Sequence, residues 1–446
     1  MCAATLVWFR LDLRLADNPA LAAAAARSGA ILPVFIWAPE EDGDWPPDAA
    51  SRWWLHQSLR SLDAALRRLG VHLILRRGPS LEALRSLVRE SGADAVFWNR
   101  RYEPVLHTRD FRVQKALLSD GLSVRTFNSS LLFKPEEISN RSGNPFRVFT
   151  PFWRTCLSAV PGSMPAAAPT FEEARPLPSL PLDESGLERV VDWAKGLRAA
   201  WRPGEAGAQS MLHRFLDNAL ADYPERRDRP TDIGTSRLSP HLHFGEISPR
   251  QVWAARAEHR NVASEAFLRQ LGWREFAHHL LYHFPHTSGA PMRPQFSRFP
   301  WRQGRSGLKA WQSGCTGYPI VDAGMLELWA AGWMHNRVRM IVGPFLVKDM
   351  LPSRIEGARW FWDTLVDADL ANNTLGWQWV AGCGAEAAPY FRIFNPATQA
   401  QKFDPRGDYV RRWVPEIDAP GYPRPIINHA QARERALEAL AAIKQL

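Results

Sequence analysis

Two short apolar runs near the N-terminus, TLVWF at residues 5–9 and ILPVFIW at residues 31–37, decide the fold. Each is bounded by polar or small residues and is too short for a buried helix, so each predicts a buried β-strand. Three runs of the same kind follow, at residues 71–76 (VHLILR), 94–98 (DAVFW) and 122–127 (LSVRTF).

The segments between these runs have helical periodicity. Residues 49–69 place Leu55, Leu59 and Leu62 three or four positions apart, which is the spacing of one helix face. Strands that alternate with helices predict an α/β domain with a doubly wound parallel sheet over residues 1–130. Because no GxGxxG sequence follows the first run, this sheet is not predicted to be an ordinary NAD site.

A proline-rich stretch then divides the chain. Six prolines lie between Pro161 and Pro181, a composition that sustains neither a helix nor a central strand. We therefore expect an interdomain connector over residues 131–190. Helical periodicity continues beyond it without convincing strand runs, so residues 191–446 are predicted to form an all-α domain.

The composition sets limits on function. The net charge of +9 favours a polyanionic partner. The cysteines and histidines lack the spacing of zinc ligands or of a disulfide framework, so no metal is expected. No run of 18 apolar residues could cross a bilayer, and the N-terminus lacks the order of a secretory signal. We expect a cytoplasmic monomer without membrane contact, with cysteines as reduced thiols at Cys2, Cys156, Cys315 and Cys383.

Residues 235–249, TSRLSPHLHFGEISP, form the first polar stretch with candidate chemistry. Hydroxyl groups and Arg237 precede a helix-like segment, which is a combination suited to phosphate. A plain helix cap beside a surface arginine accounts for the same residues equally well.

A second set of polar residues lies in WMHNRVRMI (333–341) and in residues 365–405. Because buried charges need partners, Arg339 is expected to pair with Asp367 or Asp369. Asn373 also needs a hydrogen-bond partner. A flavin ring or a purely structural polar network would each supply one.

In this order and spacing, these stretches resemble the signature of the DNA photolyase and cryptochrome family. The resemblance covers nearly the whole chain and implies an α/β antenna domain, a connector and a helical FAD domain of a blue-light flavoprotein. The matching segments are LVWFRLDLRLADNPAL from residue 6, RYEP (101–104), FRVFTPFW (146–153), TSRLSP (235–240), LGWREF (271–276), WQSGCTGYPIVDAGM (311–325), GWMHNRVRM (332–340) and FRIFNPATQAQKFDP (391–405).

The resemblance implies a folded-over FAD inside the helical domain. Arg339 would pair with Asp367, while Asp367 and Asp369 would contact the flavin and sugar region. Asn373 would face the flavin N5 atom and tune its redox state by hydrogen bonding. The implied cofactor-binding residues are Tyr223, Thr235, Ser236, Arg237, Leu238, Ser239, Arg274, Arg339, Asp367, Asp369 and Asn373.

The resemblance also implies a pocket that receives a flipped-out pyrimidine dimer of ultraviolet-damaged DNA. Trp273 and Trp379 would stack on the extruded bases, and Arg337 would hold backbone phosphates. In the family an excited, reduced flavin lends an electron that splits the cyclobutane ring, which makes the enzyme a light-driven carbon–carbon lyase. The implied substrate residues are Gln270, Trp273, Asn336, Arg337, Met340 and Trp379, of which Gln270, Asn336 and Met340 would also act on the dimer during splitting.

Gln270 departs from the family pattern, because cyclobutane-dimer enzymes usually carry glutamate there. An amide donates a hydrogen bond but supplies no proton, so binding is expected to survive better than splitting. Enzymes for (6-4) photoproducts need two histidines where this chain has His335 and Asn336, which disfavours that lesion. A cryptochrome-like photoreceptor without repair activity is the alternative, and a light-indifferent flavoprotein that binds nucleic acid is a third reading.

A second departure lies in the tryptophan relay that photoreduces the flavin. Trp377 matches the member next to the flavin and Trp301 the surface member, but the middle position falls on Arg354. Because a guanidinium is not oxidised as an indole is, we expect Trp360, or else Trp362, to bridge the gap.

The antenna chromophore is left open by the sequence. Glu103 in RYEP occupies a place where the family contacts a folate. A folate, a deazaflavin, a second flavin or an empty cleft are all compatible with these residues.

Overall fold

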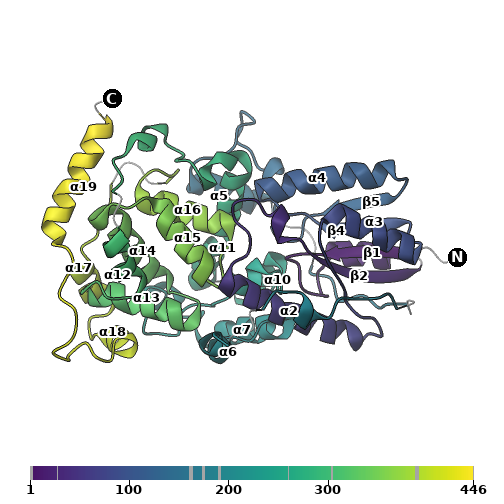
Figure 1. The fold of residues 1–446 in the computed structure, drawn as a ribbon, viewed down its shortest axis with the longest axis horizontal. Helices are drawn as coiled ribbons and strands as arrows, with labels where there is room; N and C mark the ends of the chain where they lie inside the picture. The colour runs from purple at the N-terminus through teal and green to yellow at the C-terminus, as the bar shows by residue number, and fades with distance from the viewer. Residues whose placement is uncertain are drawn as a thin grey trace.

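A five-stranded parallel sheet forms the N-terminal part of the computed structural model, in which residues 4–27, 29–159, 164–172, 176–188, 192–259, 261–302, 305–386 and 391–444 are described. The strand order is β3-β2-β1-β4-β5 (Figure 1). All five apolar runs are strands, as predicted. Their bounds are β1 Ala4–Phe9, β2 Ala30–Trp37, β3 Ile74–Arg77, β4 Ala95–Asn99 and β5 Ser123–Phe127.

Both faces of the sheet are covered, and β1 shows why. Val7 and Phe9 point into one apolar cluster, whereas Leu6 and Trp8 point into another on the opposite face. Successive side chains of a strand alternate between the faces of a sheet, so a continuous apolar run needs cover on both sides. The doubly wound α/β prediction is confirmed, with helices α1 Pro19–Ala25, α2 Ala49–Arg67, α3 Ser80–Ser91 and α4 Pro104–Ser119.

The expected connector is irregular in its described proline-rich part, while Pro161 lies outside the described residues. Helix α5, Phe149–Ser158, comes before that part and packs against α11, Val262–His283. Beyond it the backbone returns to the sheet, where Leu180 donates its N–H to the Leu75 carbonyl over 3.0 Å. The connector therefore touches both parts of the molecule.

The chain from residue 192 onward contains no strand among its described residues, which confirms the helical prediction. Its remaining helices are α6 Lys195–Ala200, α7 Glu205–Asn218, α8 Tyr223–Arg226, α9 Ser239–His243, α10 Pro249–Ala255, α12 Arg305–Gln312, α13 Pro319–Ala331, α14 Asn336–Pro344, α15 Arg354–Thr364, α16 Leu370–Ala381, α17 Pro396–Phe403, α18 Asp408–Trp413 and α19 His429–Lys444. A π-helical turn, η7 Phe345–Met350, follows α14, and the short 3₁₀ turns of the whole chain are η1 Pro39–Glu41, η2 Pro135–Glu137, η3 Leu182–Glu184, η4 Arg256–His259, η5 Pro285–Ser288 and η6 Pro294–Arg298.

The loop after β1 fixes the two parts to each other. The guanidinium of Arg14 donates to the Gly245 carbonyl over 2.9 Å and to the Ser129 hydroxyl over 2.6 Å. The carboxylate of Asp17 accepts a hydrogen bond from the Ser248 hydroxyl over 2.5 Å. Arg14 and Asp17 are both buried, so these bonds are shielded from water and the interface is well defined.

Candidate functional site

Asp367 joins two motifs whose contacting residues, Ser239 and Arg339, lie 100 residues apart in the chain. Its carboxylate accepts hydrogen bonds from Arg339 over 2.9 and 3.0 Å and from the Ser239 hydroxyl over 2.7 Å. The predicted ion pair between Arg339 and Asp367 is therefore present. It places the TSRLSP segment, the start of α14 and the loop before α16 around one point.

Asp369 is a buried carboxylate at the start of α16. One oxygen accepts the Asn372 backbone N–H over 2.8 Å and so caps the helix. The other lies 3.5 Å from His243 Nδ1 and 3.3 Å from His278 Nε2. Burial alone would raise the pKa of Asp369, but His278 and His243 hold it well below its ordinary value. The carboxylate is therefore ionised.

Asn373 lies one turn into α16 and is half-buried. Its amide donates to the Ala358 carbonyl on α15 over 3.1 Å. The structure therefore provides the hydrogen-bond partner that the sequence required, and the amide oxygen is the group left to face a ligand.

The predicted phosphate-binding segment borders a cavity of about 260 Å³. Thr235 and Ser236 line it together with Arg214 and Arg226. Arg237 has a left-handed backbone, with φ of 52°, and its buried Nε has no hydrogen-bond partner among the described residues. Hydroxyl and guanidinium donors of this kind fit a diphosphate, so this donor set is compatible with FAD.

Three other predicted cofactor residues have structural contacts. Leu238 is fully buried, and Tyr223 packs its ring against Phe267 with centroids 5.7 Å apart. Arg274 donates to the Ser130 carbonyl over 2.6 Å and thereby ties α11 to the end of the α/β part. None of the three is among the residues that line the 260 Å³ cavity.

The predicted DNA-facing tryptophans come from neighbouring helices, since α11 packs against α16. Trp273 on α11 is half-buried and stacks on Phe149, with centroids 3.8 Å apart and planes 6° apart. Trp379 on α16 lies 6.4 Å from Phe394, and the Arg392 guanidinium lies 5.5 Å from the Trp379 ring. Each indole is thus supported by another aromatic ring.

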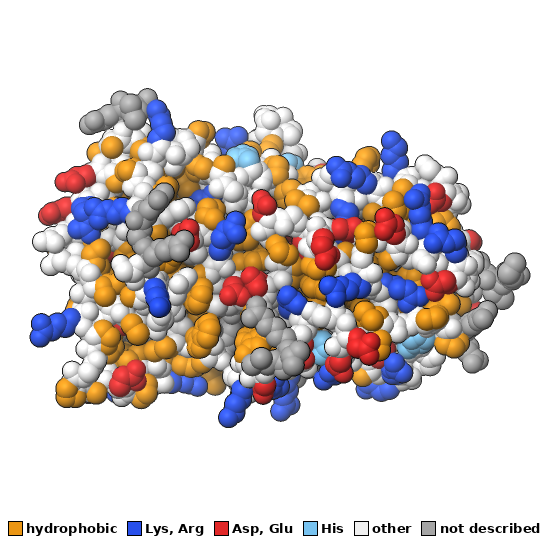
Figure 2. Space-filling model, viewed as in Figure 1, with side chains coloured by type: hydrophobic (Ala, Val, Ile, Leu, Met, Phe, Trp, Pro, Cys, Tyr) orange, Lys and Arg blue, Asp and Glu red, His pale blue; other side chains and the backbone are white. Residues whose placement is uncertain are grey.

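The start of α14 contributes Asn336, Arg337 and Met340. Arg337 forms an ion pair with Asp228 over 2.6 Å, and its guanidinium lies 4.4 Å from the Phe403 ring. The Asn336 amide is 3.9 Å from the Met340 sulfur. Gln270 lies one turn before Trp273 on α11 and is half-buried. In the view of Figure 2, basic side chains are interspersed with apolar and acidic ones over the whole face.

The tryptophans proposed for the relay have separate aromatic contacts. Trp377 is buried against Phe361 at 5.1 Å and Trp311 at 6.4 Å. Trp360 instead stacks on Trp329 at 6.1 Å, and Trp329 is 70% exposed. Within the described residues, no ring contact joins Trp360 to Trp377.

Within the described residues, no ring contact joins Trp362 or Trp301 to Trp377 either. The indole of Trp362 donates to the Pro46 carbonyl over 2.7 Å and packs against Trp45. Trp301 packs against Phe299 at 4.3 Å. At the middle position the buried Arg354 guanidinium donates to the carbonyls of Gly289, over 2.9 Å, and Thr287. The sequence did not point to Trp311 or Trp329, because neither belongs to a matching relay position.

A second cavity, of about 270 Å³, lies between the sheet and the helical part. Glu103 lines it, together with four tryptophans, Trp8, Trp37, Trp45 and Trp362. The sequence singled out only Glu103 and Trp362 of these. The remainder come from strand ends and loops that meet only in the folded chain.

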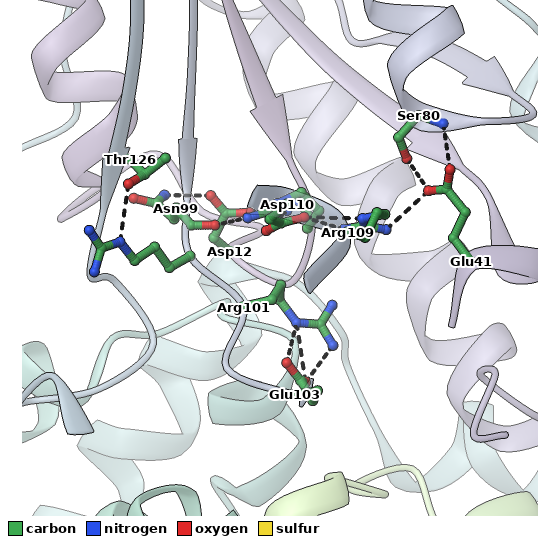
Figure 3. A network of polar contacts seen from close by, with 11 residues as sticks. Asp12, Glu41, Ser80, Asn99, Arg101, Glu103, Arg109, Asp110 and Thr126 are labelled. Carbon is green, nitrogen blue, oxygen red and sulfur yellow. Dashed lines mark hydrogen bonds and ion pairs between the residues drawn. The ribbon is translucent and has the colours of Figure 1, made fainter. Parts of the chain in front are cut away.

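Charged residues of the lining belong to the polar network drawn in Figure 3. Arg101 and Glu103 form an ion pair, and although burial opposes ionisation, Arg101 lowers the pKa of Glu103 to about 2. Burial raises the pKa of Asp42, also in the lining, to about 6. Arg109 bridges Asp110 and Glu41. Within the described residues, no helix combines the length and apolar character needed to span a membrane, and no cluster of three potential metal ligands occurs.

The fold and this site define a two-domain protein with a parallel α/β sheet and a helical flavin-binding part. Residues 5–173 match the family model for DNA photolyase, and residues 267–420 match that for the FAD binding domain of DNA photolyase. The chain belongs to the DNA photolyase and cryptochrome family.

Individual relatives agree with this assignment. The chain is 46% identical to the deoxyribodipyrimidine photo-lyase of Agrobacterium fabrum, over 99% of this chain and 98% of the relative. It is 39% identical to cryptochrome-1 of Arabidopsis thaliana, over 99% of this chain and 71% of the relative. A crystal structure of a class III photolyase from Agrobacterium tumefaciens superimposes with a TM-score of 0.94 at 45% identity, covering 100% of this chain and 98% of the other.

Proposed function

We propose that this protein is an FAD-dependent, light-driven deoxyribodipyrimidine photo-lyase that acts on cyclobutane dimers in DNA. The observation that carries the proposal is the convergence on Asp367. Ser239 and Arg339 bind this carboxylate from two separate motifs and bring the candidate phosphate segment beside α16. The strong similarity to photo-lyases over the full chain supports the same function.

FAD, when bound, supplies the light-absorbing group and the transferable electron. The protein's residues orient it. Thr235, Ser236 and Arg237 are proposed to hold the diphosphate, with Tyr223, Leu238 and Arg274 supporting that segment. Asp367, Asp369 and Asn373 are proposed to border the ring, with Asn373 presenting its amide oxygen.

The proposed substrate pocket lies between α11, α14 and α16. Trp273 and Trp379 offer flat faces for the extruded bases, and base stacking on such rings contributes about 1–3 kcal/mol per base. Arg337 and the net positive charge attract backbone phosphates. Gln270, Asn336 and Met340 are proposed to contact the dimer itself.

The decisive experiment is light-driven repair of an oligonucleotide with a single thymine dimer by purified, FAD-loaded protein. Repair by the native protein establishes the enzyme. The variant Gln270→Glu is expected to split the dimer more efficiently while binding it similarly, because the carboxyl group supplies the proton that an amide lacks. Loss of FAD uptake, or photoreduction without repair in both proteins, would contradict the proposal.

A cryptochrome-like photoreceptor is the second candidate function. The similarity to cryptochrome-1 supports this candidate. Arg354 at the middle relay position requires a photoreduction route that differs from the usual one. For this route we propose Trp377 as the inner member and Trp360 as a further member, with Trp301 as the alternative surface exit. The variant Trp360→Phe should slow flavin photoreduction under blue light; an unchanged rate would exclude Trp360.

The interdomain cavity is proposed to hold an antenna chromophore. Its tryptophans and paired charges suit a planar ligand with polar substituents. An archaeal photolyase structure from Sulfolobus tokodaii, 31% identical with a TM-score of 0.86 and covering 98% of this chain and 100% of the other, is described as containing two FAD molecules. Absorption spectra of protein reconstituted with a folate, a deazaflavin or FMN would distinguish the candidates. We further propose that the protein acts on DNA as a cytoplasmic monomer.

A further inference from the structure

Helix α5 begins at Phe149, which contacts residues on both sides of the proposed DNA pocket. The Phe149 ring lies parallel to the Trp273 indole, and the Phe149 backbone N–H donates to the carboxylate of Glu386. Glu386 belongs to the loop that follows α16, the helix that carries Trp379. A single helix start thus joins the ring that stacks on Trp273 to the loop that follows the Trp379 helix.

The stack leaves one indole face available. Phe149 is 1% exposed and has Trp153 nearly parallel to it at 6.3 Å, so its side of Trp273 is the protein interior. Phe276 meets Trp273 nearly edge-on at 5.9 Å. Trp273 is nevertheless half-buried rather than buried, so the face that remains for a base is the one opposite Phe149.

The backbone contact fixes where α5 begins. Val148, the residue before the helix, provides no side-chain cap, so the first N–H groups depend on a partner from elsewhere. Glu386 supplies it, and a carboxylate at a helix N-terminus is also favoured by the helix dipole. Ala385 packs against the same apolar cluster as Phe149, which holds this loop in place.

We propose that Phe149 and Glu386 are positioning residues that set the plane of Trp273 and its spacing from the Trp379 helix, and thereby the affinity for a flipped dimer. This inference rests on the proposed function. Neither residue is proposed to touch the substrate. Both act through the tryptophans, so their removal is expected to affect damaged DNA more than undamaged DNA.

The test is dark binding of a thymine-dimer oligonucleotide and its undamaged counterpart to the FAD-loaded protein, measured by fluorescence anisotropy. Phe149→Leu removes the stack and should weaken lesion binding about 3- to 10-fold, the range expected for one aromatic pair, with little change for undamaged DNA. Phe149→Tyr keeps the ring and should remain close to wild type. Glu386→Ala should weaken lesion binding in the same direction but less.

Phe152→Leu is the matched control. Phe152 is as buried as Phe149 and lies on the same helix, but its ring contacts are Phe146, Phe276 and His279. Equal loss in Phe149→Leu and Phe152→Leu would overturn the inference, as would loss of both kinds of DNA together. If Phe149→Leu does not fold, Glu386→Ala and Phe149→Tyr carry the test.

The double variant Phe149→Leu with Glu386→Ala adds a second criterion. Because both changes release the same helix start, the combined loss should be smaller than the product of the two single losses. A fully multiplicative loss would contradict a shared role. Wild-type protein that does not distinguish damaged from undamaged DNA would instead refute the proposed function.

Discussion

Two arginines of the α/β part and two arginines of the helical part are held by different kinds of partner. Near the sheet, Arg10 pairs with Asp110 over 2.7 Å, and Arg101 pairs with Glu103. In the helical part, Arg237 lies between the Trp201 and Trp333 rings, at 5.0 and 4.3 Å, and Arg354 binds backbone carbonyls. Neither Arg237 nor Arg354 forms an ion pair within the described residues.

This difference separates structural charge from charge that is available to a ligand. A carboxylate partner cancels the charge of an arginine, whereas an aromatic ring or a carbonyl orients the guanidinium without cancelling it. The pairs of Arg10 and Arg101 therefore help to hold the interdomain cavity, which both residues line, in shape. In the helical part Arg339 is paired with Asp367, whereas Arg237 and Arg354 keep positive charge that an anionic ligand can meet.

The largest expected effect comes from breaking a pair in the α/β part. Asp110→Asn leaves Arg10, which is only 6% exposed, without its carboxylate. Removal of one partner of a buried pair costs about 3–5 kcal/mol in the free energy of unfolding. Urea denaturation measures this loss, while the FAD content of the purified protein should stay at the wild-type level. A variant with wild-type stability but a reduced FAD content would show that this pair serves cofactor binding rather than stability.

Glu275 is a buried acid in the helical part, and its titration can be measured. Its carboxylate accepts the Leu132 N–H over 2.9 Å, and burial raises its pKa to about 7 despite the nearby Arg274. A raised acid pKa favours the protonated folded state, so this contribution to stability is present below about pH 4.5 and is lost as the pH rises to about 7.

Glu275→Gln removes this titration. Relative to wild type, the variant should therefore gain about 3 kcal/mol in unfolding free energy between pH 4.5 and pH 8. Denaturation curves of both proteins across that interval give the difference directly. A constant difference at all pH values would show that Glu275 titrates normally.

Asp367→Asn tests the helical part of the comparison. Arg339 is 25% exposed, so its loss of a partner is cushioned by water and the effect on stability should be smaller than for Asp110. The loss of one charge-assisted contact, about 1.5–3 kcal/mol, should instead lower FAD affinity about 10- to 100-fold, as measured by flavin fluorescence on dilution. Asp120→Asn, which breaks the surface ion pair of Asp120 with Arg85, serves as the control.

Arg354→Trp bears on the kinetics of photoreduction rather than on FAD binding. It replaces a buried guanidinium by an oxidisable indole at the middle relay position. Photoreduction of the bound flavin under blue light should become faster, while undamaged-DNA affinity stays the same. An unchanged rate would show that the native protein already has an efficient route that bypasses this position.

The sheet and the helical part could be predicted because their signals are local. The continuous apolar run TLVWF required cover on both faces of the sheet at β1. Arg339 required an acidic partner, which the chain supplies at Asp367. The environment of the relay could not be predicted in this way. The stack of Trp360 on Trp329 depends on how α13 and α15 pack. The spacing of the two residues in the sequence does not indicate this contact. The same holds for the tryptophans of the interdomain cavity.

The buried bonds from Arg14 and Asp17 to the segment Gly245–Arg250 have a consequence for light harvesting. Energy passed between two pigments falls steeply with their separation. Here that separation is fixed by side chains locked inside the protein rather than by a flexible joint. The yield of energy transfer from a pigment in the interdomain cavity to one in the helical part would then be set by the fold and would not change when DNA binds.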